Sequence, residues 1–430
     1  MAGEIRIDEL GPKGDGISSS QRGRVYIERA LPGETLRANI RRGDDGMLRG
    51  EIVAVLEASP HRVKPPCPNY DLCGGCTLQH ADEGFYRDWK VAIVRDALKR
   101  KGLTPKTWRE PVFVPPATRR RATFNAHKHN GKVTLGYFRR RTHRVTEIRS
   151  CLVADPAIMA LRDRLPPLLA PILTEGKDAD IFIQMVGGRF ELAITGPVGK
   201  KGKPDLPVRE AIAALAQQAD INRVSWRARE RDQRDDIEVM IERNPLMATF
   251  GALDVALPSL AFLQPTEAGE AALVEAVLEL LPAAGRFADL FAGSGTFTGP
   301  MLARGPVDAY ESAAPAVRAL DKAALRKIGG ALPLKAFRRD LEREPLRREE
   351  ANRYDAIVFD PPRAGAAEQA KALASAKTPL LVAVSCNPAS FARDARFLVD
   401  GGYRLETVKV IDQFTFSHHV ELVAGFSKRG

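Results

Sequence analysis

The stretch ADLFAGSGTFTG, residues 288–299, decides the fold class of this 430-residue chain. It begins as a buried strand that carries Asp289 at its end, and Gly293 and Gly295 lie in the turn that precedes a helical pattern. From about residue 258 onward, helical patterns alternate with short apolar strands at residues 307–311, 354–360 and 380–385. Strands separated by helices predict a parallel, doubly wound sheet, so the fold class is α/β.

Two further strands of this region end in carboxylates. Glu311 closes the strand of residues 307–311, where it is well placed to accept hydrogen bonds from a ribose diol, and Asp340 follows the next strand, where a carboxylate can receive an adenine amine. In an open α/β sheet such strand ends meet at one edge. Gly299 stands one position too late for the dinucleotide spacing G-x-G-x-x-G, so we expect S-adenosylmethionine rather than NAD as the ligand.

The fifth strand raises a separate question. In VAVSCNPASFARD, residues 382–394, an apolar run delivers Cys386 to its tip and is broken at once by Asn387 and Pro388. A free cysteine is ordinarily an inert, buried apolar residue. The preceding strand runs into Asp360, followed by Pro361, Pro362 and Arg363, and amino methyltransferases carry an aromatic residue where this chain has the arginine. That difference argues against methylation of an exocyclic amine.

The other four cysteines form a separate group. Cys67, Cys73 and Cys76 lie together in CPNYDLCGGC, and Cys151 follows in RSCLV. Disulfides are a poor fit to a reducing cytosol. The spacing predicts a four-sulfur site for zinc or for an iron–sulfur cluster, with a slight preference for the cluster. Such a site leaves Cys386 as the one candidate nucleophile.

The chain divides into three segments by pattern. Residues 1–58 alternate apolar and polar positions between Gly-rich turns, which predicts a small antiparallel β-barrel. Residues 59–256 carry the cysteine group and then strand-like and helical runs, so we expect a mixed α and β domain. Residues 257–430 hold the doubly wound sheet. No apolar stretch approaches the length of about 18 residues that suggests a membrane span, and the N-terminus has no secretory pattern. We therefore expect a cytoplasmic monomer.

Charge is concentrated in the middle segment. The net charge is +11, and residues 111–146 contain no acidic residue. The basic residues of this stretch are Arg119, Arg120, Arg121, Lys128, Lys132, Arg139, Arg140, Arg141 and Arg144. Phe124, Tyr137 and Phe138 are interleaved with them, which favours a polyanion whose bases can stack. Single-stranded RNA fits this mixture better than double-stranded DNA does.

Taken together, these motifs resemble one family, the RNA uracil-5-methyltransferases, and within it the branch that modifies 23S ribosomal RNA. The resemblance covers nearly the whole chain and rests on CPNYDLCGGCTLQH with Cys151, LGYFRRRTHRVTEIRSCLV, FLQ (262–264), DLFAGSGTF (289–297), DPPRAG (360–365), SCNP (385–388) and HHVE (418–421). The chain departs from the family at Ala292, where a cysteine is usual, and at Thr266, where an asparagine is usual.

The resemblance implies a class I (Rossmann-like) methyltransferase domain at residues 257–430, a TRAM-like RNA-binding barrel at residues 1–58, and a central [4Fe–4S] domain whose ligands are Cys67, Cys73, Cys76 and Cys151. It implies that Cys386 adds to C6 of a uracil, that C5 then takes the methyl group, and that Glu421 removes the C5 proton. Asp360 and Gln264 would position the uracil or the methyl donor, and nearby donors or Arg363 would favour the thiolate. The implied cofactor-binding residues are Gln264, Asp289, Phe291, Gly293, Gly295, Glu311, Asp340 and Asp360.

Three alternatives compete with this interpretation. An RNA cytosine-5-methyltransferase also uses a thiolate at C6, although it usually carries that thiolate in different motifs. A tRNA uracil-54 methyltransferase belongs to the same family, but its branch generally lacks the barrel and the cluster. A non-catalytic RNA-binding protein would keep the barrel and the cysteines and would not bind S-adenosylmethionine. His418 and His419 are interpreted as a solvated pair.

Overall fold

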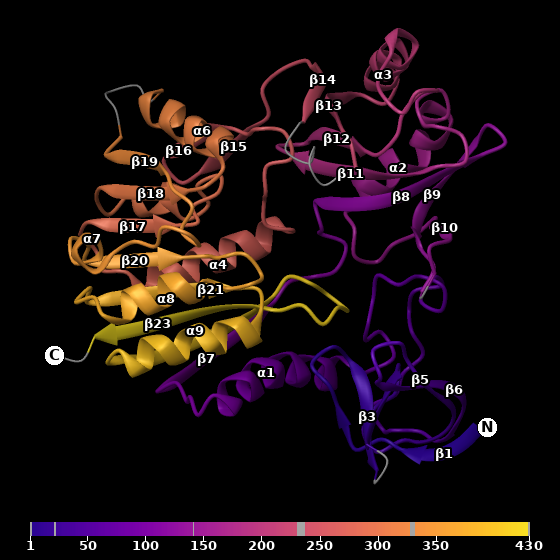
Figure 1. Cartoon of the computed structure of the whole chain (residues 1–430), viewed down its shortest axis with the longest axis horizontal. Coiled ribbons are helices and arrows are strands. Elements are labelled where there is room, and N and C mark those ends of the chain that lie inside the picture. The colour runs from indigo at the N-terminus through magenta and orange to yellow at the C-terminus, as the bar shows by residue number, and fades with distance from the viewer. Residues whose placement is uncertain (1, 21–22, 141, 230–236, 327–331, 429–430) are drawn as a thin grey trace.

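The computed structural model describes the chain except for residues 1, 21–22, 141, 230–236, 327–331 and 429–430. Three regions follow one another along the chain and occupy separate places in Figure 1. Arg141, one of the basic residues named above, lies outside the described residues. Within the described residues, we find no helix with the length and apolar character needed to cross a bilayer.

The first region is a six-stranded sheet in the order β1-β5-β6-β4-β3-β2. Neighbouring strands are antiparallel except β4 and β6, which are parallel. Its small core contains Ile7, Val25, Ile27 and Leu36. The strands are β1 (Ala2–Arg6), β2 (Glu9–Leu10), β3 (Asp15–Ser20), β4 (Gly23–Glu28), β5 (Thr35–Arg42) and β6 (Leu48–Glu57).

The middle region is built on a seven-stranded sheet in the order β10-β9-β8-β11-β12-β13-β14, and its core also includes α2 (Pro156–Leu169) and α3 (Leu206–Gln218). Helix α3 connects the parallel strands β12 and β13. The strands are β8 (Arg121–His129), β9 (Lys132–Phe138), β10 (Val145–Glu147), β11 (Asp178–Val186), β12 (Arg189–Thr195), β13 (Ile221–Arg227) and β14 (Glu238–Glu242). A separate hairpin, β15 (Met247–Phe250) and β16 (Leu253–Ala256), leads into the last region.

The last region confirms the α/β prediction. Its eight-stranded sheet has the order β19-β18-β17-β20-β21-β23-β22-β7, and β17 to β21 are parallel while β23 is antiparallel to both of its neighbours. The strands are β17 (Phe287–Leu290), β18 (Val307–Glu311), β19 (Leu334–Arg338), β20 (Ala356–Phe359), β21 (Leu380–Ser385), β22 (Tyr403–Asp412), β23 (Glu421–Lys428) and β7 (Thr107–Phe113).

Both faces of this sheet are buried, which explains why its strands are continuously apolar. In β20, Ile357 and Phe359 enter one core and Ala356 and Val358 enter the other. The helices are α4 (Glu267–Leu280), α5 (Thr298–Met301), α6 (Ala314–Leu325), α7 (Arg348–Ala351), α8 (Ala367–Ala374) and α9 (Pro388–Asp400). This arrangement leaves the loops at the strand ends as the place for a ligand.

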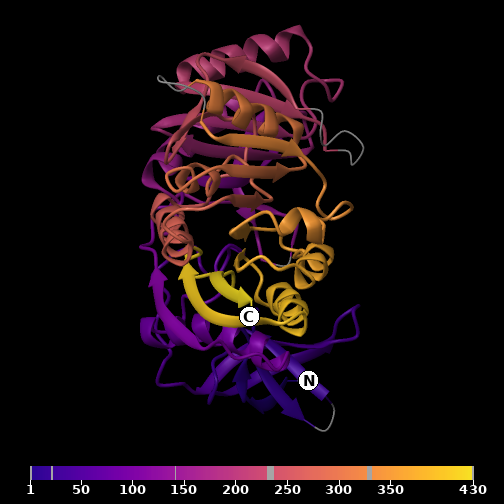
Figure 2. The ribbon, with the colours of Figure 1, turned by 90° about the vertical axis from the view of Figure 1, so that its left-hand side faces the viewer.

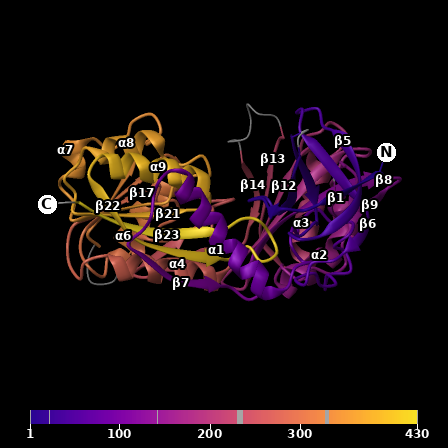
Figure 3. The ribbon, with the colours of Figure 1, turned by 90° about the horizontal axis from the view of Figure 1, so that it is seen from below.

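One helix and one strand of the middle segment belong in space to this last region. Helix α1 (Glu83–Arg100) begins at Asp82, whose side chain accepts from the Phe85 amide at 2.8 Å, and it buries Trp89, Ile93 and Leu98 in the core of the C-terminal sheet. Strand β7 then pairs with β22 and forms the edge of the sheet. Figure 2 shows the purple β7 beside the yellow C-terminal strands, and Figure 3 shows α1 crossing below them. The sequence segments and the packed cores therefore do not coincide.

Candidate active site and four-cysteine pocket

The turn that follows β21 fixes the position of Cys386. The Asn387 side chain caps α9 by accepting from the Ala389 amide at 3.1 Å, and Pro388 occupies the first helical turn, where its missing N–H costs nothing. The side-chain Nδ2 of Asn387 also donates to the carbonyl of Arg363 at 2.9 Å. The abrupt Asn-Pro break therefore holds the cysteine at the N-terminus of a helix and ties it to the loop that follows Asp360.

The surroundings of Cys386 disfavour its thiolate form. Burial raises its pKa to about 11, and the charges of Glu421 and Asp360 act in the same direction. Arg363 lowers the pKa, as expected, but its effect is smaller than that of burial and the two carboxylates. The expectation that nearby donors favour the thiolate is therefore wrong for the unliganded site, because the carboxylates outweigh the arginine.

Asp360, which is half-buried, and Glu421, which is buried, are a pair of carboxyl groups whose charges act on this thiol. Asp360 follows β20, and Glu421 opens the antiparallel strand β23, so both lie at the same edge as the end of β21. Burial raises the pKa of Asp360 to about 7, and burial together with the charge of Asp360 raises the pKa of Glu421 well above its usual range. The raised pKa values mean that the surroundings favour the neutral forms of both acids.

Two residues that the sequence motifs do not single out complete the surroundings of Glu421. The Gln413 side chain is hydrogen-bonded to Glu421 and donates to Oε1 of Gln264 at 2.7 Å. Arg121, from β8 of the middle region, is the cation whose charge opposes the rise in the pKa of Glu421, and its guanidinium lies 4.2 Å from the ring centroid of Phe262. Arg121 is present in the basic stretch of the sequence, but only its fold shows which acid it faces.

Gln264 is buried and held from the middle region. Arg120 donates from Nε to the Gln264 carbonyl at 3.0 Å and from its backbone to the Pro265 carbonyl at 2.8 Å. Thr266 caps α4 by accepting from the Gly269 amide at 2.9 Å. Threonine and asparagine both serve as N-caps, so the departure at Thr266 keeps the helix start. A Cβ at Gly269 would lie 2.3 Å from Oε1 of Gln413, which requires glycine there.

The loop after β17 fits a small cationic ligand. Asp289 is fully buried, its Oδ2 accepts from Thr298 Oγ1 at 2.5 Å, and its Oδ1 has no partner in the structure. Burial raises its pKa to about 7, and the charges of Asp360 and Glu311 act in the same direction. This concentration of acids disfavours its own charged form, so a ligand that carries positive charge would relieve it.

Backbone geometry shapes the rest of this loop. Phe291, Gly293 and Gly295 have φ values of +63°, +54° and +96°. The Gly293 amide donates to Glu311 Oε2 at 3.0 Å, and a Cβ at Gly293 would meet nothing within 4 Å, so open space adjoins the loop there. At Gly295 a Cβ would lie 2.7 Å from Leu320, so packing excludes a side chain. The alanine at 292 is buried, with its amide bonded to the Tyr310 carbonyl.

Asp340 lies apart from these contacts. Its exposed side chain accepts from the Glu342 amide at 3.1 Å and pairs with Arg343 at 3.4 Å, which closes a turn two residues beyond β19. Five of the predicted site residues act on one another through their charges and therefore belong to one site: Asp289, Glu311, Asp360, Cys386 and Glu421. Gln264 is linked to Glu421 through Gln413. Asp340, by contrast, makes the local turn contacts just described.

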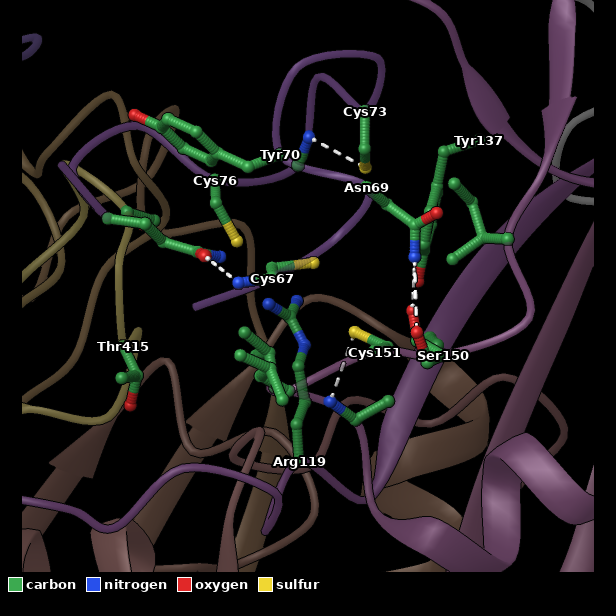
Figure 4. Close-up of a pocket in the computed structure, with 18 of the residues that line it drawn as sticks. Cys67, Asn69, Tyr70, Cys73, Cys76, Arg119, Tyr137, Ser150, Cys151 and Thr415 are labelled. Carbon is green, nitrogen blue, oxygen red and sulfur yellow. Dashed lines mark hydrogen bonds between the residues drawn. The ribbon is translucent and has the colours of Figure 1, made fainter. Parts of the chain in front are cut away.

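The four predicted cysteine ligands line one cavity of about 250 Å³. Figure 4 shows their sulfurs facing this space from two chain segments, with Arg119 and Thr415 at its border. Burial raises the pKa of Cys73, and it raises that of Cys76 to about 12. Among the described residues, no group of three or more His, Cys, Asp or Glu side chains is arranged to hold a metal ion. The thiols surround a space and do not converge on one point.

The basic stretch divides in two. Arg119, Arg120 and Arg121 face inward toward the sites just described, while Lys132, Arg139 and Arg144 are exposed. The expectation that the interleaved aromatics stack on bases is wrong for two of them. Phe124 is fully buried and its ring lies 5.1 Å from that of Tyr137, and Tyr137 packs against the same core because β8 and β9 turn these side chains inward.

Comparisons with known proteins agree with this geometry. The family described as tRNA (Uracil-5-)-methyltransferase matches residues 335–428. A protein of Caulobacter vibrioides described as an uncharacterized RNA methyltransferase is 39% identical and covers 99% of this chain and 100% of its own length. The 23S rRNA (uracil(1939)-C(5))-methyltransferase of Acinetobacter baumannii is 31% identical, over 94% of this chain and 89% of its own.

A solved structure shares the whole fold. The Pyrococcus abyssi tRNA (uracil-54, C5)-methyltransferase in complex with S-adenosyl-L-homocysteine superimposes with a TM-score of 0.75 at 20% identity, over 99% of each chain. The three regions of the present chain thus have counterparts in the fold of that protein.

Proposed function

Because the chain belongs to the RNA uracil-5-methyltransferase family, we propose that it methylates C5 of a uridine in 23S rRNA through a covalent bond between Cys386 and C6 of the base. Membership of this family makes it an RNA methyltransferase that uses S-adenosylmethionine. The observation that carries the proposed mechanism is the meeting of one thiol and two carboxyls, Cys386, Asp360 and Glu421, at one edge of three adjacent strands.

The chemistry needs a nucleophile and a base at one place. C5 of uracil is a weak nucleophile, and attack of the Cys386 thiolate on C6 converts the ring to an enolate with carbanion character at C5. When bound, S-adenosylmethionine supplies an electrophilic methyl group and a positive charge. After the methyl group has joined C5, Glu421 takes the C5 proton, the C5–C6 double bond re-forms, and the Cys386 thiolate leaves.

Proton transfer follows from the raised pKa values. The thiol must lose its proton before attack, and Asp360, with a pKa of about 7, is suited to accept it near neutral pH. Glu421 must be ionised when the C5 proton leaves, and the hydrogen bond from Gln413 and the charge of Arg121 both favour that form. Gln264, held by Gln413, is proposed to position the uracil.

The cofactor is proposed to lie along the loop after β17. The unpartnered Oδ1 of Asp289 supports a role in accepting from an ammonium group, and the open space beside Gly293 supports close approach of the ligand to the backbone. Glu311 is proposed to accept from the ribose, and Phe291, Gly295 and Asp360 to line the same site. The exposed position of Asp340 is compatible with contact only at the outer, adenine end.

A [4Fe–4S] cluster is proposed for the pocket of Cys67, Cys73, Cys76 and Cys151. The proposal is supported by the placing of all four thiols around one cavity, because four cysteine thiolates are the ligand set of a [4Fe–4S] cluster. Thiolates bind the metal, so the raised pKa values of Cys73 and Cys76 mean that loading releases protons. The N-terminal sheet, interpreted as TRAM-like, and the exposed cations of the basic stretch are proposed to bind RNA.

The choice of 23S rRNA over tRNA rests on the Acinetobacter baumannii relative, which matches this chain along nearly all its length. The presence of an N-terminal sheet and a central region does not separate the two substrates, because the tRNA enzyme of Pyrococcus abyssi covers 99% of this chain in the fold comparison. The tRNA uracil-54 reaction therefore stays as the alternative, supported also by the description of the matching family.

The substrate is tested by direct comparison of the two RNAs. Unmodified 23S rRNA and unmodified tRNA are incubated separately with the reconstituted protein and isotopically labelled S-adenosylmethionine, and nuclease fragments are examined by mass spectrometry. The proposal predicts label in 5-methyluridine at one or a few positions of 23S rRNA. Label confined to tRNA would overturn the choice of substrate, and label in 5-methylcytidine would overturn the uracil chemistry.

A further inference from the structure

Two chain segments that border the four-cysteine pocket continue directly into the surroundings of Glu421. The first is the loop of residues 413–420 between β22 and β23, which begins at Gln413 and ends one residue before Glu421. Thr415 and Ser417 of this loop line the pocket together with the four cysteines. Only three residues of chain therefore separate Ser417, at the cavity, from the proposed catalytic base.

Backbone hydrogen bonds fasten this loop to the cysteine segment. The carbonyl of Phe416 accepts from the amides of Thr77 at 2.7 Å and Leu78 at 3.1 Å, and these two residues directly follow Cys76. Phe416 has a φ of +61°, a conformation that a residue with a large side chain adopts only where its surroundings hold it. The cysteine segment supplies part of that hold.

The second segment is residues 119–121. Arg119 lines the pocket, Arg120 donates to the Gln264 carbonyl, and Arg121 faces Glu421. Of three consecutive residues, one thus lines the pocket, one bonds the proposed uracil-positioning glutamine, and one acts through its charge on the proposed base.

Helix α1 fixes both ends of the loop without the pocket. Asp412, the last residue of β22, accepts from Lys90 Nζ at 2.8 Å and from the hydroxyl of Tyr86, both on α1, and Lys90 also donates to the His419 carbonyl. At the centre of the loop, α1 and the cysteine segment share the support: the Phe416 amide donates to the Tyr86 hydroxyl at 3.0 Å, and the Phe416 carbonyl accepts from the cysteine segment.

We propose that the four-cysteine pocket positions Glu421 for removal of the C5 proton, acting through the loop of residues 413–420. The inference rests on the proposed role of Glu421. It makes Thr415, Phe416 and Ser417 positioning residues, and it predicts that loss of the pocket slows breakdown of the covalent adduct more than it slows formation of that adduct.

The first test needs no turnover. Cys73→Ser and Cys151→Ser each remove a thiol from a different wall, and Cys386→Ser removes a thiol outside the pocket. Backbone hydrogen exchange is followed by mass spectrometry in peptides that cover residues 413–421 and α1. The proposal predicts faster exchange at residues 413–421 in both pocket variants, protected amides in α1, and no change in Cys386→Ser. Unchanged exchange at residues 413–421 in a pocket variant that has lost its metal would overturn the coupling.

The second test separates positioning from a general loss of structure. Protein and labelled RNA are mixed with S-adenosylmethionine, and the ratio of denaturant-stable protein–RNA adduct to released methylated RNA is measured. Glu421→Gln removes the base and sets the upper limit of that ratio. The proposal predicts a ratio at least about tenfold above wild type in Cys73→Ser and Cys151→Ser. Adduct and product that fall in equal proportion would show a merely structural role and overturn the inference.

If Cys73→Ser and Cys151→Ser do not fold, a variant that keeps every cysteine tests the proposal instead. Ser417→Ala removes a hydroxyl that lines the pocket and accepts from the His419 amide at 3.0 Å. Ser427→Ala, at the far end of β23, is its matched control. The proposal predicts a raised adduct ratio for the first and an unchanged ratio for the second, and equal ratios would overturn it. No adduct in wild type would instead contradict the proposed function, so the two failures are distinguishable.

Discussion

At the scale of single residues, the site concentrates acids that cannot all be charged at once. Burial raises the pKa of Asp289 and of Asp360 to about 7, and burial together with the charge of Asp360 raises the pKa of Glu421 well above its usual range. Cys386 shares this potential, and its pKa rises to about 11. The site therefore disfavours negative charge on its thiol and carboxyl groups, and a cationic ligand would oppose that effect.

Replacement of Asp360 tests this account of the thiol. Asp360→Asn removes a negative charge that raises the pKa of Cys386, so more thiolate is present at a given pH. We expect the rate of alkylation of Cys386 by iodoacetamide at pH 8 to rise roughly three- to tenfold, which corresponds to half to one pKa unit. The rate is read from the Cys386 peptide by mass spectrometry. Asp308→Asn, another buried strand carboxyl, is the control, and an equal rise there would contradict the explanation.

Near neutral pH, where Asp289 is proposed to bind the cofactor, burial of its carboxylate should lower the stability of the folded protein. Its pKa in the folded protein is about 7 against an ordinary value of 3.8, so its contribution to stability is fully present below about pH 3.8 and is lost as the pH rises through about 7. Asp289→Asn should therefore have a higher unfolding temperature than wild type at pH 8, no such advantage at pH 4, and weaker binding of S-adenosylmethionine. Scanning calorimetry and isothermal titration measure the two effects. Equal unfolding temperatures at pH 8 would contradict the assigned burial cost.

At the scale of elements, the sequence predicts what is local and misses what is distant. Alternating helical and apolar patterns predict β17 to β21 and their helices, and the break at Asn387–Pro388 places Cys386 at a strand tip. Strand β7 could not be predicted, because it pairs with β22 some 300 residues later and carries Pro111 where the register shifts. Gln413 and Arg121 were missed as site residues for the same reason, since their shared partner Glu421 is set by the fold.

Helix α1 contributes the strongest contact between distant elements at the site. Lys90 is fully buried and pairs with Asp412 at 2.8 Å, so Lys90→Met leaves a buried carboxylate without its cation. We expect a loss of about 3–5 kcal/mol in the free energy of unfolding. The double variant Lys90→Met with Asp412→Asn should recover part of that loss, because the remaining group is neutral. Urea unfolding provides the measurement.

The control for this pair lies on the same helix. Lys99, in the last turn of α1, is exposed, and Lys99→Met should change the free energy of unfolding by no more than about 0.5 kcal/mol. If Lys90→Met were as mild as Lys99→Met, the Lys90–Asp412 pair would not be the support that holds the base of the loop at residues 413–420.

At the scale of the whole molecule, the three regions meet around the two sites. Arg140 joins them, since it donates to Glu28 of the N-terminal sheet at 3.2 Å and to the Cys76 carbonyl at 2.9 Å. The exposed cations of the middle region, Lys132 and Arg144 among them, remain free to meet phosphates, which the buried arginines of the same stretch do not. Only the exposed cations of the basic stretch should therefore contribute to the dependence of RNA binding on ionic strength.

Salt dependence measures that part. Binding of 23S rRNA fragments should weaken linearly in log–log form with salt concentration, and each of Lys132→Ala and Arg144→Ala should reduce the magnitude of the slope by about one if its cation meets a phosphate. Lys322→Ala, an exposed lysine on α6, is the matched control and should leave the slope unchanged. Equal slopes in all four proteins would remove these cations from the RNA-binding surface.

The most direct test of the central claim is release of tritium from uracil C5. Unmodified 23S rRNA labelled with tritium at C5 of its uridines is incubated with S-adenosylmethionine and either the wild-type protein or Cys386→Ala. Methylation at C5 through a thiolate adduct predicts release of tritium into water by the wild type, in step with methyl transfer, and no release by the variant. Methyl transfer to the RNA without release of tritium would contradict the account, because the methyl group would then have joined another atom and neither Cys386 nor Glu421 would have the role assigned to it.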